Sequence, residues 1–158
     1  MTLKQLAEVT QINTHRRKMW MQLISFLAIP VLSNKFSYAY FGGGFVSNKP
    51  HPGDIDVVLE TEDAYGPEAF AAVSRFFVIG LEQIEALYGV DLHFWMRDAP
   101  EGLSDYRNFF QYDKRSKKVS VLSPTRGIVR LDLREPELLC QLRCYLRDEP
   151  FEKSGVES

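Results

Sequence analysis

The stretch Phe41 to Glu60 reads FGGGFVSNKPHPGDIDVVLE and joins consecutive glycines, a proline-containing turn and an Asp-x-Asp pair before an apolar run. The glycines Gly42 to Gly44 can adopt φ values closed to other residues and leave backbone amides open to a phosphate chain. The apolar run Val57 to Leu59 marks a buried strand, on which residues two apart face the same side. Asp54 and Asp56 therefore share a face, where carboxylates can hold a hard cation such as Mg²⁺ together with substrate phosphates.

A third acidic residue is needed, because two carboxylates on one strand do not complete a two-metal site. Asp91 is the natural candidate, since it begins the strand expected after the next helix. The strand–helix–strand order over 54–96 predicts a right-handed crossover between parallel strands that are neighbours or lie one apart. Two metal ions ~3.5–4 Å apart would activate an attacking hydroxyl and stabilise the triphosphate and the leaving oxygen. This pattern predicts transfer of a nucleotidyl group.

Hydrophobic periodicity predicts an α/β (α+β) arrangement in a single compact domain. Helices are expected over 2–11, from residue 14 to a stop or kink at Pro30, over 66–88, and over 135–147, with a short one possible at 105–110. Strands are expected over 36–41, 54–60, 90–96, 119–122 and 128–133.

Buried stripes at helical spacing support three of these helices. In the second helix the stripe is Trp20, Leu23, Ile24 and Leu27, and in the last helix it is Leu138, Leu139, Leu142 and Leu146. The long central helix opens at Pro67, ends at Gly89 and is expected to bury Phe70, Val73, Phe77, Leu81, Ile84 and Tyr88.

The composition is that of an ordinary globular chain: 158 residues, 45% hydrophobic, with a net charge of −2. This length predicts one domain over 1–150 and a flexible tail over 151–158. Such a balance gives no general signal for nucleic-acid binding. Either of the basic clusters at 16–18 and 114–118 could meet a polyanion, but the favoured interpretation of both is solvated surface.

Cys140 and Cys144 are too few for a secreted disulfide scaffold and indicate a reducing cytoplasm, with both thiols half-buried. The apolar run Trp20 to Leu32 is shorter than the ~20 residues that span a bilayer. No membrane association is expected.

These residues resemble the nucleotidyltransferase superfamily typified by DNA polymerase β, whose signature is a glycine turn, a spacer of about ten residues, Asp-x-Asp and a later acidic residue. The matching residues here are Gly42-Gly43-Gly44, Asp54-Ile55-Asp56 and Asp91. The segment Phe45 to Gly53 is also similar to small, poorly characterised bacterial nucleotidyltransferase-like proteins. The resemblance covers Tyr38 to Trp95, and more weakly Arg126 to Leu131.

The resemblance implies a nucleotidyltransferase fold, a mixed twisted sheet flanked by helices. It implies that Asp54, Asp56 and Asp91 bind Mg²⁺ or Mn²⁺ and are catalytic, and that the glycine turn holds the phosphates of a nucleoside triphosphate such as ATP. One departure is Gly44, which stands where the family often has serine. Ser47 is the candidate to replace that hydroxyl.

Other residues give weaker signals. Lys49 and Arg126 are candidates to neutralise phosphate charge, although solvated side chains are the commoner outcome. His93 faces the same side as Asp91, where a satisfied, half-buried histidine is the favoured interpretation, and His51 is at most a substrate contact.

Four other interpretations fit parts of the pattern less well. A dinucleotide-binding turn must open a helix, which the prolines at 50 and 52 forbid. In an aspartyl-phosphate phosphatase the apolar strand comes before the acidic residues, whereas here it follows them. A glycosyltransferase with an Asp-x-Asp motif usually needs a larger nucleotide-binding domain than this chain supplies. Two solvated aspartates at a strand entry would explain Asp-x-Asp alone, but not its distance from the glycines or Asp91.

The sequence therefore predicts a metal-dependent nucleotidyltransferase acting on an RNA, protein or small-molecule acceptor. The resemblance makes a toxin–antitoxin or phage-defence context plausible. The rival prediction is an inactive member that binds a nucleotide, RNA or another protein.

Overall fold

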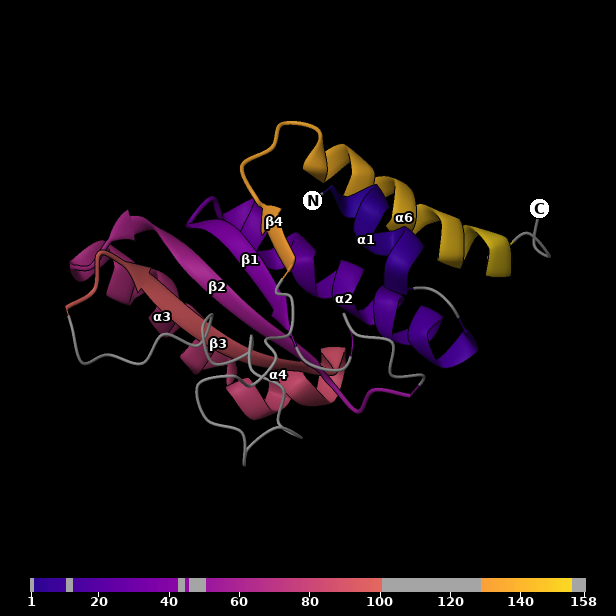
Figure 1. Cartoon of the computed structure of the whole chain (residues 1–158), viewed down its shortest axis with the longest axis horizontal. Coiled ribbons are helices and arrows are strands. Elements are labelled where there is room, and N and C mark those ends of the chain that lie inside the picture. Colours follow the sequence, from indigo (N-terminus) through magenta and orange to yellow (C-terminus); the bar gives the residue numbers. More distant parts are fainter. Residues whose placement is uncertain (1, 11–12, 43–44, 46–50, 101–128, 155–158) are drawn as a thin grey trace, which may run out of the picture.

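A computed structural model describes residues 2–10, 13–42, 45, 51–100 and 129–154. Within them the chain forms helices and strands in a mixed order (Figure 1). The helices are α1 (Leu3–Thr10), α2 (Thr14–Ser33), α3 (Pro67–Ile79), α4 (Leu81–Tyr88) and α6 (Leu138–Ser154). The strands are β1 (Phe36–Gly42), β2 (Ile55–Ala64), β3 (Val90–Arg97) and β4 (Val129–Asp132).

The four described strands form one mixed sheet in the order β3-β2-β1-β4 (Figure 1). β1 pairs antiparallel with β2 and with β4, whereas β2 and β3 are parallel. The expected α+β class and the parallel pairing across the helical crossover are confirmed, and the parallel strands are direct neighbours.

The two faces of the sheet differ in chemistry. One face carries buried apolar side chains that belong to the core shared with the helices, among them Ala39, Phe41, Val57, Leu59 and Leu92. Register places the alternate residues on the opposite face, because paired residues in a sheet point the same way. That second face carries Tyr38, Tyr40, Asp56, Glu60, Asp91 and His93.

α2 is the central helix of the core. Its first turn is capped by Asn13, whose side chain accepts a hydrogen bond from the backbone N–H of Arg16 at 2.8 Å. The predicted stripe of Trp20, Leu23, Ile24 and Leu27 is confirmed, since all four are wholly buried. Pro30 does not end the helix, which runs on to Ser33 and stops where Asn34 adopts a left-handed conformation.

The predicted long helix over 66–88 is wrong, because it is two helices separated at Gly80. This glycine has φ of +97°, and its N–H closes α3 on Phe76 while its carbonyl accepts the first bond of α4 from Ile84. Apolar spacing continues across the break, so periodicity alone did not reveal it. Pro67 does occupy the first turn of α3, as expected.

The buried face of α3 also differs from the predicted one. Phe70 and Phe77 are 46% and 59% exposed. Val73 is buried as expected, and the other buried residues of α3 are Ala69, Ala72 and Phe76. α3 is apolar on most of its circumference, so small residues can face the sheet while aromatic residues remain outside.

The C-terminal helix packs beside α1 and α2 (Figure 1). It begins at Leu138, later than predicted, and continues past residue 147 to Ser154. Leu138 and Leu142 are buried as expected, but Cys140 and Cys144 are exposed and not half-buried. The division into a domain over 1–150 and a tail stays a prediction.

Several predicted features lie outside the described residues: the short helix over 105–110, the strand over 119–122 and the basic cluster at 114–118. Across the helices that the structure describes, none has both the length and the apolar character needed to cross a membrane.

Candidate functional site

The site begins with the register between two neighbouring strands. Asp56 on β2 is the direct partner of Asp91 on β3, in the parallel pair. Paired residues project to the same face, so the two carboxylates leave the sheet side by side. Asp56 is only 8% exposed, because it lies in an inner strand, whereas Asp91 on β3 is more accessible.

Asp54 joins this pair from just outside the sheet. It precedes Ile55, the first residue of β2, and the two-residue spacing sends its side chain toward the face of Asp56. Oxygen atoms of Asp54, Asp56 and Asp91 all lie within 4.8 Å of one another. The predicted convergence of three carboxylates from two strands is therefore confirmed, while their roles stay predictions.

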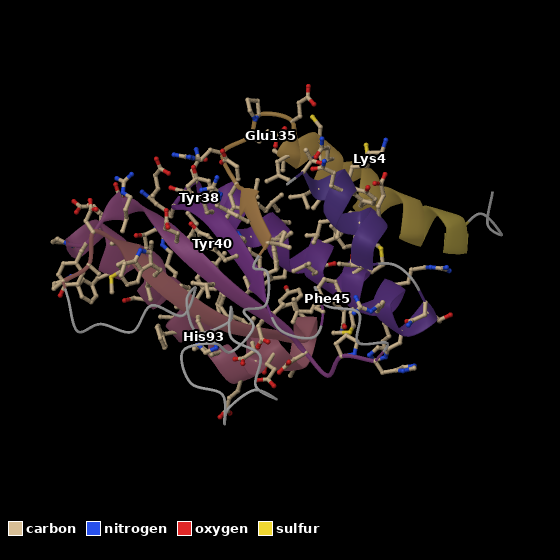
Figure 2. All side chains as sticks on the ribbon, viewed as in Figure 1. Lys4, Tyr38, Tyr40, Phe45, His93 and Glu135 are labelled. Carbon is tan, nitrogen blue, oxygen red and sulfur yellow. The ribbon has the colours of Figure 1, made fainter. Side chains whose placement is uncertain are left out.

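His93 contacts this group of carboxylates. Its Nε2 lies 3.2 Å from Asp91 Oδ1, and the two side chains are 25% and 42% exposed. Register places His93 two residues along β3 on the same face (Figure 2). The half-buried, partnered histidine expected from the sequence is found, and its partner is one of the three acids.

The glycine turn meets the acids at its first residue. Gly42 ends β1 and pairs with Asp56, so the start of the turn lies beside the carboxylates. Gly43, Gly44, Ser47, Lys49 and Arg126 lie outside the described residues. Their predicted contacts with a triphosphate stay predictions.

Two side chains at the start of α2 contact the segment between the glycines and Asp54, and neither contact was predicted from the sequence. Arg16 is wholly buried, and its Nη1 donates a hydrogen bond to the carbonyl of Phe45 at 2.5 Å. His15 Nε2 lies 2.8 Å from the carbonyl of Pro52. The interpretation of 16–18 as solvated surface is thus wrong for Arg16, while Arg17 and Lys18 are exposed.

A signal for Arg16 was present in the sequence. It stands four residues before Trp20, on the stripe that continues through Leu23 and Leu27. A charged residue on the buried stripe of a helix needs a polar partner, because leaving it unpaired is costly. Burial also lowers the pKa of the Arg16 guanidinium.

The same sheet face carries a second cluster at its other end. The guanidinium carbons of Arg130 and Arg134 each lie 4.7 Å from the centre of the Tyr38 ring. Arg134 donates to Tyr38 Oη at 2.6 Å, and a hydrogen bond from Arg134 to Asp132 raises the arginine pKa. This cluster was not predicted, since it depends on the pairing of β4 with β1.

The three carboxylates fit a hard divalent cation. Asp side chains supply the oxygen ligands that Mg²⁺ and Mn²⁺ prefer. Three negative charges this close repel one another, and a bound cation would offset that repulsion. Across the residues that the structure describes, this is the one group of three or more acidic, His or Cys side chains close enough to hold a metal ion.

A protein-family model matches most of the chain. The model of a family described as "Family of unknown function (DUF6932)" matches residues 1–132. Neither the curated proteins nor the solved structures contain a match to this chain.

Proposed function

The chain belongs to DUF6932, a family of unknown function, and we propose from the site itself that it is a metal-dependent nucleotidyltransferase. The observation that carries the proposal is the grouping of Asp54, Asp56 and Asp91 within 4.8 Å beside Gly42. The resemblance of the same residues to the DNA polymerase β superfamily adds support. It implies a nucleotidyltransferase fold for the α+β domain.

In this proposal the three aspartates hold Mg²⁺ or Mn²⁺, which supplies charge stabilisation for the phosphates when bound. An acceptor hydroxyl attacks the α-phosphorus of a nucleoside triphosphate, the bond to the β-phosphate oxygen breaks, and pyrophosphate leaves. The hydroxyl proton passes to an aspartate oxygen. His93, bound to Asp91, restrains that carboxylate in the orientation the cation needs.

The acceptor is proposed to be RNA, a protein or a small molecule in a reducing cytoplasm, in a toxin–antitoxin or phage-defence setting. These proposals rest on the resemblance and on the scarcity of cysteines.

The test replaces the acids without changing their size. We expect Asp54→Asn with Asp56→Asn to abolish incorporation of label from the four α-labelled triphosphates in a cell extract supplied with Mg²⁺ or Mn²⁺. Asp91→Asn alone should reduce incorporation by at least ~100-fold. Loss of a residue that only orients a metal ligand costs ~10–100-fold, and Asp91 is proposed to be a ligand itself.

The matched control is Asp98→Asn. Asp98 is exposed and has φ of +58°, a conformation that asparagine tolerates equally well. Incorporation by this variant should equal that of the wild type. Undiminished incorporation by the Asp54/Asp56 double variant would rule out the proposed metal site.

A second candidate function is an inactive relative that binds a nucleotide, RNA or a protein. Gly44 favours this second function, because nucleotidyltransferases often have a serine at that place in the glycine motif. The hydroxyl contact of that serine to the triphosphate is lost unless Ser47 supplies it. Calorimetry with ATP separates the two functions. ATP binding that requires Mg²⁺ supports the enzyme. ATP binding that is the same with and without Mg²⁺ supports the inactive relative.

A further inference from the structure

Asp54 is held differently from the other two acids. Asp56 and Asp91 belong to the paired strands, so sheet hydrogen bonds fix their backbones. Asp54 precedes β2 and has no place in that ladder. On its C-terminal side, the N–H of Ile55 donates to the carbonyl of Gly89 at 2.8 Å. Its N-terminal side must be restrained by contacts outside the sheet.

His15 provides such a restraint. Its Nε2 lies 2.8 Å from the carbonyl oxygen of Pro52, two residues before Asp54. A carbonyl oxygen only accepts, so this ring nitrogen is the donor. The ring of His15 also lies 5.3 Å from that of His51, centre to centre. His15 therefore contacts two consecutive residues just before Asp54.

Arg16 holds the residue that follows the glycines. Its Nη1 donates to the carbonyl of Phe45 at 2.5 Å, and its guanidinium carbon lies 5.8 Å from the centre of the Phe45 ring. Both side chains are wholly buried. A buried charge-assisted hydrogen bond is stronger and more directional than an exposed neutral one, so Phe45 is firmly fixed to α2.

The two contacts come from consecutive residues on one rigid helix. Asn13 caps the turn, and the buried side chains of Trp20, Leu23 and Leu27 fix the helix in the core. One helical turn thus restrains Phe45, just after the glycine turn, and Pro52, just before the acids. The two contacts therefore attach Phe45 and Pro52 to the same helix.

We propose that His15 is a positioning residue of the candidate site: it sets the place of Asp54 relative to Asp56 and Asp91. This inference rests on the proposed function, because it takes the three aspartates to be the metal ligands. It predicts that loss of the His15 contact weakens metal binding although His15 lies outside the carboxylate cluster.

The experiment measures Mn²⁺ affinity of the full chain by the loss of the free-ion electron paramagnetic resonance signal. We expect His15→Ala to weaken Mn²⁺ binding about two- to tenfold, the value of one hydrogen bond. His15→Gln keeps an N–H donor and should restore most of the affinity.

Arg17→Ala is the matched control, since Arg17 is exposed on the same turn. Its Mn²⁺ affinity should equal that of the wild type, and thermal melting of every variant confirms that it is folded at the assay temperature. If folded His15→Ala binds Mn²⁺ with the affinity of the wild type, the inference is overturned and the proposed function is unaffected. Equal losses in His15→Ala and His15→Gln also overturn it. A wild-type protein that binds no Mn²⁺ overturns both.

Discussion

Arg16 and Arg17 are adjacent in the sequence and have opposite environments in the structure. Arg16 is wholly buried against Phe45, whereas Arg17 is exposed. The difference follows from helical geometry, because successive residues on a helix point about 100° apart. At the scale of one residue, the position on the helix decides whether each arginine is buried, and membership of a charged cluster does not.

At the same scale, His93 is predicted to increase the affinity of the carboxylate cluster for Mn²⁺. Replacing it with alanine removes the 3.2 Å contact to Asp91 and leaves that carboxylate free to rotate. Partners of metal ligands typically contribute ~10–100-fold in affinity. Because His93 is partly exposed, we expect a loss of Mn²⁺ affinity near ~10-fold, measured by titration calorimetry.

His93→Gln is the conservative comparison, since its amide can still donate to Asp91. It should lose less affinity than His93→Ala. Equal Mn²⁺ affinity in the wild type and His93→Ala would show that the contact with Asp91 does not orient a ligand.

At the scale of elements, Gly80 decides that α3 and α4 are separate helices. A Cβ at this position would meet only Gln83 Cβ at 3.8 Å, which is an ordinary contact. The cost of Gly80→Ala is therefore conformational, arising from φ of +97°. We expect a loss of ~1–2 kcal/mol in the free energy of unfolding, measured by urea denaturation.

Gly53→Ala is the matched control. A Cβ there meets nothing within 4 Å, and no left-handed φ is required. Its stability should be unchanged or higher by up to ~1 kcal/mol, because alanine restricts the unfolded chain. If Gly80→Ala were equally stable, the interruption between α3 and α4 would not depend on the glycine conformation.

The helices also show when a local sequence pattern is enough to predict which face is buried. α2 starts at Thr14 and buries the predicted stripe, since a cap at Asn13 and apolar spacing agree there. α3 buries Val73 of its predicted stripe but leaves Phe70 and Phe77 exposed, because several of its faces are apolar enough to pack on the sheet. A pattern identifies a face only when the other faces are polar.

At the scale of the whole molecule, the proposed metal site would link metal binding to folding. The three carboxylates come from β3, β2 and the residue before β2, so the cluster exists only when the strands are paired. A ligand that binds only the folded state stabilises it by about 2.7 kcal/mol at 100 times its Kd. Saturating Mn²⁺ should therefore raise Tm by several degrees in a thermal melt.

Asp56→Asn should lose most of this Tm increase, while Asp98→Asn should keep it. An equal increase in both variants would place the stabilising cation elsewhere on the protein.

The sequence alone determined the elements that local chemistry controls: the capped helix α2, the strands on either side of the glycine turn, and the Asp-x-Asp pair on one face. Those features depend on backbone geometry that a residue shares with its near neighbours. Only the tertiary structure decided that β2 and β3 are adjacent, that Asp91 meets Asp56 in register, and that His15 and Arg16 contact Pro52 and Phe45. These contacts join residues far apart in the chain, and their energies depend on a packed core that no local pattern specifies.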